Sequence, residues 1–242
     1  FWPMKVDVLA IGAHPDDVEL GCGGTIAKLI SEGKKVAIID LTEGELGTRG
    51  TNETRAQEAA TASEILGISA RENLKMKDGF IINSQEYQFR IIEMIRKYQP
   101  EIVLCNAIDD RHPDHAKAAK LVSDACFLSG LVKIKTDYEG ESQKFWRPKQ
   151  VFHYIQWKNI EPDFVMDISG FLDKKIEACL AYKTQFYDPT STEPMTPIAT
   201  KDFLESLTYR AQDLGRLSGV EYAEGFTTEK LLAFKNFEGI IC

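Results

Sequence analysis

Short apolar runs alternate with helix-like segments over the first half of the chain. The runs at 6–11, 36–41 and 101–106 are nearly continuous and rich in β-branched residues, which is typical of buried strands. The segments that follow them carry apolar residues three and four positions apart, which predicts amphipathic helices. These predicted helices lie at 24–33, 53–67 and 84–98, and in a stretch that ends near Ser129.

Strands that alternate with helices of this length are joined by right-handed crossovers, which makes neighbouring strands parallel. We therefore expect an α/β fold with a largely parallel sheet flanked by helices, a Rossmann-like three-layer sandwich. In the second half the pattern is looser, with strands expected at 150–157 and 164–169 and helices at 171–186 and 201–218. No linker interrupts the chain, so residues 1–242 are expected to form a single domain.

The segment 184–200 joins the last two predicted helices. It contains three prolines and shows no periodicity. A connection of this length within a compact domain usually serves a function. The segment is expected either to act as a lid over a functional site or to be disordered.

Two polar clusters follow two of the predicted strands. His14-Pro15-Asp16-Asp17 comes directly after the run 6–11, and Asp109 to His115 (DDRHPDH) comes just after the run 101–106. In open α/β sheets, ligands bind outside the carboxyl ends of the strands. If these two strands are neighbours, both clusters face one crevice.

The residue types in these clusters suit a divalent metal. His14 and Asp17 lie three residues apart on a strand-to-helix turn, and His115 can supply a third ligand from the other cluster. Two imidazoles and one carboxylate with an open position are typical of a catalytic Zn²⁺ site, and Fe²⁺ accepts the same ligands. Asp16 and Asp17 alone could instead stabilise a helix N-terminus, but helix capping does not explain the second cluster.

Composition excludes several classes of partner. The net charge is −8 and no run is rich in Lys or Arg, which argues against a nucleic-acid partner. No apolar run approaches the roughly 18 residues of a membrane helix, and the N-terminus lacks the layout of a signal peptide. We expect a cytoplasmic protein that does not bind membranes. Met4 is a natural start for the chain, so no functional role is expected for residues 1–3.

The five cysteines are widely spaced and never in CxxC pairs. Neither a disulfide framework nor a thiolate zinc site is expected from this spacing. Cys22 lies near the first cluster, where a thiol between glycines is expected to pack beneath the turn. His153 is expected to be a hydrogen-bonded histidine within a strand.

The motifs AHPDDVELGCGGT and HPDH resemble the two signatures of the LmbE/PIG-L family of zinc-dependent N-acetylglucosaminyl deacetylases, as do TEGELGTRG and ETRAQEA. The resemblance implies one Zn²⁺ per chain, held by His14, Asp17 and His115, with Asp16 as general base. It also implies that His112 stabilises the oxyanion and protonates the leaving amine. Asp114 is expected to hold the His112 imidazole.

The resemblance extends to the substrate. It is greatest to the bacillithiol-biosynthesis branch, whose members deacetylate N-acetylglucosaminyl malate. Arg55 matches a family arginine that contacts substrate, and Glu43 and Arg49 are further candidates. In members that act on the mycothiol precursor a tyrosine occupies the position of Asp110, so Tyr187 is considered as the second oxyanion donor.

Arg111 is expected either to bind an anionic aglycone such as malate or to be a solvated surface side chain. The resemblance also implies a homo-oligomer, a hexamer being one form, with the apolar segment 127–134 either at an interface or in the core.

Three other functions compete. A dinucleotide site is not expected, because two carboxylates at the helix start repel a pyrophosphate and the glycine spacing differs from the fingerprint. A non-catalytic sugar-binding protein on the same fold remains an alternative. An amidase that acts on a non-sugar substrate is the other.

Overall fold

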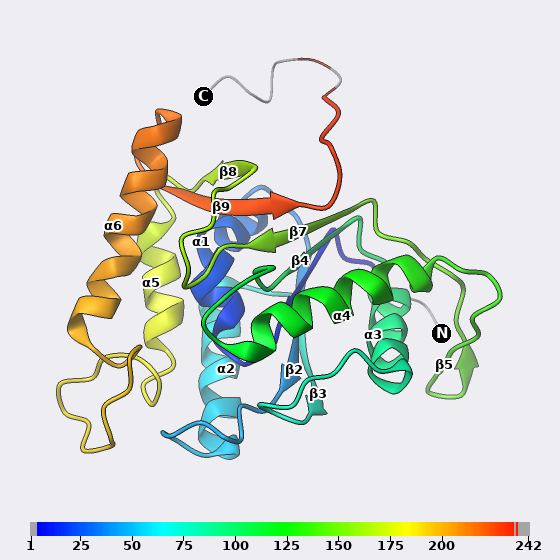
Figure 1. The fold of residues 1–242 in the computed structure, drawn as a ribbon, viewed down its shortest axis with the longest axis horizontal. Helices are drawn as coiled ribbons and strands as arrows, with labels where there is room; N and C mark the ends of the chain where they lie inside the picture. The colour runs from blue at the N-terminus through cyan, green and yellow to red at the C-terminus, as the bar shows by residue number, and fades with distance from the viewer. Residues whose placement is uncertain (1–3, 235, 237–242) are drawn as a thin grey trace.

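The computed structural model describes residues 4–234 and 236 of the chain, so Phe1 to Pro3 and Cys242 lie outside it. Its largest element is a seven-stranded sheet in the order β3-β2-β1-β4-β7-β9-β8. All of its strands run parallel except β9, which pairs antiparallel with both β7 and β8 (Figure 1). The strands are β1 (Val8–Gly12), β2 (Val36–Thr42), β3 (Ala70–Met76), β4 (Ile102–Cys105), β7 (Gln150–Tyr154), β8 (Phe164–Asp167) and β9 (Ala223–Thr228).

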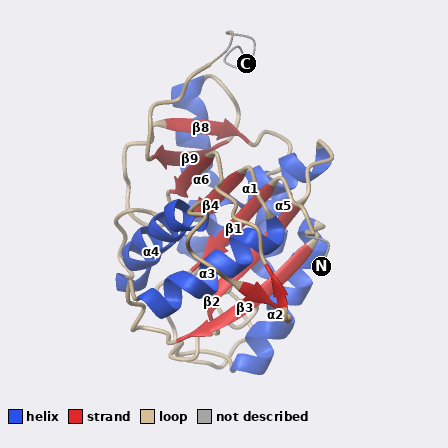
Figure 2. Ribbon diagram, turned by 90° about the vertical axis from the view of Figure 1, so that its right-hand side faces the viewer, coloured by secondary structure: helices blue, strands red, loops and turns tan. Residues whose placement is uncertain are grey.

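Helices cover both faces of this sheet (Figure 2). Two pack together on one face and three on the other, and α6 packs against β9. The first pair is α3 (Gln85–Tyr98) and α4 (Pro113–Ser129); the others are α1 (Asp17–Ser31), α2 (Asn52–Leu66), α5 (Leu172–Leu180) and α6 (Lys201–Ser218). The expected three-layer α/β fold is confirmed. A small hairpin, β5 (Asp137–Tyr138) and β6 (Glu141–Ser142), lies outside the sheet.

The alternation of side chains along β1 explains why its run is apolar throughout. Leu9 and Ile11 belong to the core that contains α3 and α4, whereas Val8 and Ala10 belong to the core beneath α1. Because successive strand residues point to opposite faces, a strand covered on both sides has no polar positions.

Two strands of the large sheet, β3 and β9, were not predicted, nor was the small hairpin of β5 and β6. Both β3 and β9 carry charged side chains with partners in other elements. Arg71 of β3 donates to Asp40 of β2 at 2.7 Å and to Glu19 of α1 at 2.6 Å. Glu224 of β9 accepts from the Thr25 amide at 2.7 Å and pairs with Lys175. These charged residues interrupt the apolar pattern that predicts a buried strand. Their burial is favourable only because residues from other elements pair with them.

The predicted helix at 171–186 is shorter in the structure, where α5 ends at Leu180. The chain then turns so that Tyr182 and Phe186 join a third core cluster with α2 and α6. No helix in the described part of the chain combines the length and apolar character required to cross a membrane.

The central position of β1 determines where a ligand can bind. It pairs parallel with β2 on one side and with β4 on the other, with Ile11 beside Cys105. The chain continues from β1 to β2 and β3 on one side and then crosses back to β4 on the other, so the strand order reverses and a crevice opens at the carboxyl ends of β1 and β4. The two predicted polar clusters follow these two strands.

Candidate metal centre and active-site cavity

The turn after β1 separates the roles of Asp16 and Asp17. Asp16 occupies the N-cap position of α1 but makes no capping hydrogen bond through its side chain, and its φ is 109°. Such a left-handed conformation is unfavourable for most non-glycine residues. Asp17 turns inward, and its Oδ2 accepts a hydrogen bond from the His14 amide at 2.9 Å. Capping therefore does not account for Asp16.

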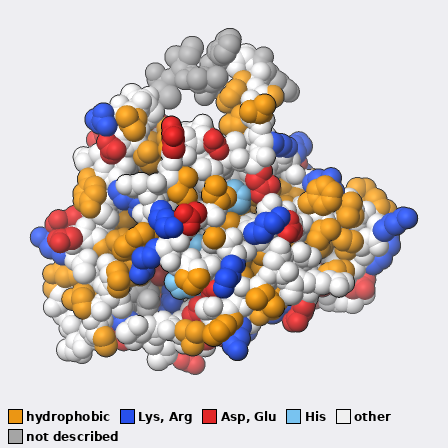
Figure 3. Space-filling model, in the orientation of Figure 1, with side chains coloured by type: hydrophobic (Ala, Val, Ile, Leu, Met, Phe, Trp, Pro, Cys, Tyr) orange, Lys and Arg blue, Asp and Glu red, His pale blue; other side chains and the backbone are white. Residues whose placement is uncertain are grey.

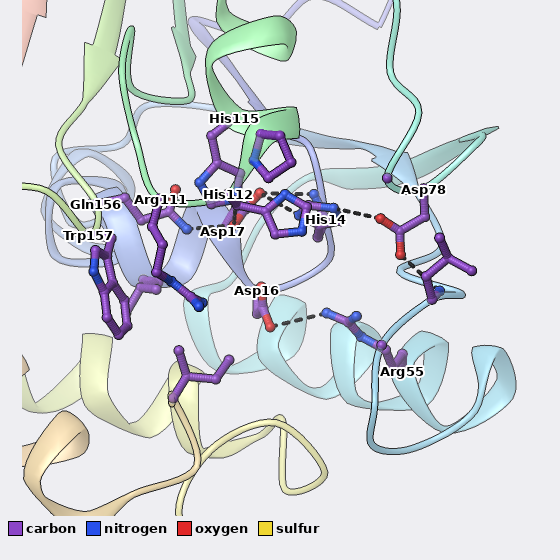
Figure 4. A pocket seen from close by; sticks show the side chains of 16 residues that line it. His14, Asp16, Asp17, Arg55, Asp78, Arg111, His112, His115, Gln156 and Trp157 are labelled. Carbon is purple, nitrogen blue, oxygen red and sulfur yellow. Dashed lines mark hydrogen bonds and ion pairs between the residues drawn. The ribbon is translucent and has the colours of Figure 1, made fainter. Parts of the chain in front are cut away.

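Asp17 lies between the two histidines with which it was grouped. Its Oδ2 is 3.4 Å from His14 Nδ1, and its Oδ1 is 3.2 Å from His115 Nε2. Two amides hold the same carboxylate: Asn106 Nδ2 donates to Oδ2 at 3.0 Å and Gln156 Nε2 to Oδ1 at 2.5 Å. The structure thus brings His14, Asp17 and His115 together, although they come from the ends of two strands (Figure 4).

His115 is oriented by a carboxylate on its far side. Its Nδ1 lies 2.7 Å from Asp110 Oδ2, which leaves Nε2 directed at Asp17. A carboxylate behind a histidine fixes the tautomer of a metal-binding imidazole. Asp110, the position at which some family members have tyrosine, therefore acts on a histidine here.

His112 begins α4 as its N-cap, and its Nδ1 accepts from the Asp114 amide at 3.2 Å. Its ring centroid lies 4.5 Å from that of His14 and 5.1 Å from that of His115. Three of the four histidines are buried and His112 is half-buried, so only small patches of histidine surface are visible in Figure 3.

Asp114 differs from its expected role. Its carboxylate accepts from the amides of Gly79 at 2.7 Å and Ile81 at 3.4 Å, and lies 3.7 Å from His14 Nε2. It is the backbone of Asp114, and not its side chain, that holds His112. The carboxylate is directed away because it satisfies the amides of the loop after β3.

Asp78 was missed from the sequence. Its Oδ1 lies 2.9 Å from His14 Nε2, and its Oδ2 accepts from the Leu46 amide. It follows β3 closely, as Asn106 follows β4 and Gln156 follows β7. A polar residue just beyond a strand end is the signal that could have identified all three, but β3 was itself not predicted.

The donor set fits a divalent cation. Two groups of side chains bring potential ligand atoms within 4.8 Å of one another: His14, His112 and His115, and His14, Asp78 and Asp114. With Asp17 between His14 and His115, the centre offers imidazole nitrogens and carboxylate oxygens only. Such donors suit Zn²⁺ or Fe²⁺.

The pKa values of the two aspartates also differ, because their surroundings carry different charges. Burial raises the pKa of Asp16 to about 7 although Arg55 opposes this effect, and the neighbouring Asp17 adds to it. Burial also acts to raise the pKa of Asp17, but the charge of His115 and hydrogen bonds from both histidines outweigh it, and the pKa falls well below its usual range. Asp17 is thus the permanent anion, and Asp16 can exchange a proton near neutral pH.

The histidines respond to the same charges. Burial lowers the pKa of His115, but Asp17 and Asp110 outweigh it and raise this pKa to about 9. Burial and the charges of His14 and His115 lower the pKa of His112. This environment does not favour the protonated His112 that we expected.

Arg55, from α2, pairs with Asp16. Its Nη2 donates to Asp16 Oδ2 at 3.1 Å and to the Pro15 carbonyl at 2.5 Å, and its Nη1 donates to the Gly44 carbonyl. A Cβ at position 44 would overlap Nη1, so only glycine allows this approach. Arg55 orients Asp16 and also lines the cavity.

A cavity of about 280 Å³ opens over the cluster. Besides the groups described, its walls include Leu20, Leu46, Arg111, Trp157 and Ile198. Ile198 comes from the segment 184–200, which therefore forms part of the wall.

Three predicted substrate residues do not line this cavity. Arg49 donates to Ser191 and lies 3.5 Å from Glu193, so it anchors the 184–200 segment. Glu43 pairs with Lys75 at 3.3 Å. Tyr187 is half-buried elsewhere in that segment. A second oxyanion donor from tyrosine is therefore not found among the described residues of the cavity wall.

Comparison with known proteins identifies the family of this chain. The sequence model of the PIG-L (GlcNAc-PI de-N-acetylase) family matches residues 9–126, which include both polar clusters. The diacetylchitobiose deacetylase of Thermococcus kodakarensis is 30% identical over 229 residues, spanning 90% of this chain and 81% of that protein. The chain belongs to the PIG-L family.

Further relatives show the range of the family. A probable N-acetyl-α-D-glucosaminyl L-malate deacetylase 2 of Bacillus subtilis is 29% identical, covering 75% of this chain and 84% of that protein. The 4-oxalmesaconate hydratase of Pseudomonas putida is 28% identical and covers 77% of each chain. The crystal structure of the conserved protein TT1542 from Thermus thermophilus has a TM-score of 0.86 and 34% identity, covering 97% of this chain and 99% of that one.

Proposed function

We propose that this PIG-L family member is a metal-dependent hydrolase that removes the acetyl group from an N-acetylglucosaminyl substrate. The observation that carries the proposal is the Asp17 carboxylate set between His14 and His115, with Asp16 beside it at a pKa of about 7. His14, Asp17 and His115 would hold one Zn²⁺ or Fe²⁺. A metal at these ligands supplies Lewis-acid polarisation of the acetamide carbonyl and a more acidic water.

The side chains account for the proton transfers. Asp16 accepts the proton of the attacking water, and Arg55 keeps its carboxylate directed into the cavity. When the C–N bond breaks, the amine needs one proton, and Asp16 at the cavity wall returns the one it accepted from the water, because the lowered pKa of His112 does not favour a protonated imidazole. The products are acetate and the free amino sugar.

The substrate proposed is N-acetylglucosaminyl malate, which would place the protein in bacillithiol biosynthesis. Arg111 at the cavity wall supports an anionic aglycone, because its guanidinium can bind a carboxylate. The malate-deacetylase relative also supports it.

Acetate release tests the proposal. We expect the protein with added Zn²⁺ to release acetate from N-acetylglucosaminyl malate, to lose this activity after chelation, and to regain it when Zn²⁺ or Fe²⁺ is restored. Acetate measured by an enzyme-coupled assay is the readout. No acetate from this substrate or from N-acetylglucosamine would exclude the sugar deacetylase and leave a non-sugar amidase, a hydratase like the Pseudomonas relative, or a sugar-binding protein.

The amide of Gln156 provides a test that does not depend on turnover. Gln156→Ala removes the 2.5 Å hydrogen bond to Asp17 Oδ1 and should weaken Zn²⁺ binding about 10-fold or more, as the loss of a group that orients a ligand does. Zn²⁺ affinity measured by competition with a chromophoric chelator is the readout. Gln150→Ala, at the opposite end of β7, is the control and should bind Zn²⁺ as the unaltered protein does. Equal affinities in both variants would contradict the role of Gln156.

A further inference from the structure

Trp157 at the cavity wall contacts both a cation and a second aromatic ring. The Arg111 guanidinium lies 4.4 Å from the centroid of the Trp157 ring. Phe203, in the first turn of α6, is stacked on Trp157 with centroids 5.2 Å apart and an interplanar angle of 16°. The three side chains come from the loops after β4 and β7 and from α6, so tertiary structure alone assembles this stack.

This stack disfavours direct stacking of a sugar ring on the Trp157 indole. The Arg111 guanidinium lies over the Trp157 ring, and the Phe203 ring is stacked nearly parallel to the Trp157 ring. A sugar ring that stacked on Trp157 would therefore compete with Arg111 and Phe203 for the faces of the indole. The indole instead supports the guanidinium, which runs beside it in Figure 4.

The acidic groups near Arg111 are engaged elsewhere. Asp109 binds Lys158 Nζ at 2.8 Å, Asp110 binds His115, and Asp16 binds Arg55. Within the described part of the chain, no hydrogen bond or ion pair joins the Arg111 guanidinium to another side chain. A guanidinium stacked on a ring keeps the N–H donors at its edge available for a planar carboxylate.

We propose that Trp157, backed by Phe203, is a positioning residue that holds Arg111 for an anionic group on the substrate. The substrate class is an N-acetylglucosaminide whose aglycone carries a carboxylate. This inference rests on the proposed deacetylase function. It adds that selectivity for the anionic aglycone depends on an aromatic pair that does not itself bind the substrate.

The experiment compares two substrates, N-acetylglucosaminyl malate and the uncharged methyl N-acetylglucosaminide. In Trp157→Leu we expect KM for the malyl substrate to rise about 5-fold, within the range of a lost cation–π contact, with kcat and the KM of the methyl substrate nearly unchanged. Trp157→Phe retains an aromatic face and should restore most of the affinity. Arg111→Gln should raise KM for the malyl substrate by about 10-fold or more.

A double variant separates positioning from packing. If Trp157 acts through Arg111, then adding Trp157→Leu to Arg111→Gln should produce no further rise in KM for the malyl substrate. Phe127→Leu is the matched control, because Arg147 lies 4.4 Å over that ring at a site outside the cavity wall. It should leave both KM values unchanged.

Several outcomes overturn the inference. Equal rises in KM for both substrates in Trp157→Leu, or additive effects in the double variant, would make Trp157 a packing residue. Equal KM values for both substrates in the unaltered protein would contradict the proposed selectivity for an anionic aglycone. The proposed deacetylase function would still stand. Acetate released from neither substrate would refute the proposed function and this inference together.

Discussion

Asp17→Ala is expected to abolish metal binding. The carboxylate lies 3.4 Å from His14 and 3.2 Å from His115, and among the described residues it is the only carboxylate within ion-pair distance of both histidines. Without this carboxylate, the buried side-chain amides of Asn106 and Gln156 lose their shared acceptor. Each unsatisfied amide lowers the free energy of unfolding by about 1–3 kcal/mol. Zn²⁺ affinity should fall by well over 100-fold, since even a group behind a ligand contributes about 10- to 100-fold.

Metal content by atomic absorption and affinity by chelator competition measure this effect. The matched control is Asp109→Ala, which removes an aspartate from the second polar cluster whose side chain is 65% exposed and paired with Lys158. The control should bind Zn²⁺ normally. If Asp17→Ala retained stoichiometric Zn²⁺ with normal affinity, the ligands would instead belong to one of the two groups whose ligand atoms lie within 4.8 Å of one another: His14, His112 and His115, or His14, Asp78 and Asp114.

Asp16→Asn should have the opposite signature, with metal retained and turnover lost. An amide cannot accept the proton of water, so kcat should fall about 10²- to 10⁴-fold, the usual contribution of a general base. Asparagine is the appropriate replacement because Asp16 has a φ of 109°, and asparagine tolerates positive φ better than alanine does. The substitution therefore tests the proton transfer with little change to the turn.

The readouts are kcat for acetate release and Zn²⁺ content on the same sample. Asp109→Asn, the same chemical change at a paired and exposed position, should leave kcat unaltered. Full activity in Asp16→Asn would remove the general base from the proposal. Loss of Zn²⁺ in this variant would show that Asp16 is a ligand, and the division between the two aspartates would then be wrong.

The sequence by itself determined the parallel core of the fold and the location of its chemistry. β1, β2 and β4 are covered by helices on both faces, so they appear as nearly continuous apolar runs that need no partner to be recognised. The polar clusters were identifiable because they interrupt the chain directly after these apolar strands. Charge directly after a buried strand has no role in the core, and parallel strands bring their carboxyl ends to one edge. The family resemblance rested on these same residues.

Tertiary structure alone decided which charges are free and which are engaged. Arg49 could have faced a substrate, but Ser191 and Glu193 of a remote segment bind it. Asp114 could have held His112, but its carboxylate accepts a hydrogen bond from the Gly79 amide in the loop after β3. β3 itself was hidden because Arg71 is buried only through Asp40 and Glu19. The free energy of a buried polar group depends on its partner, and partners from other elements have no signature in the local pattern of the chain.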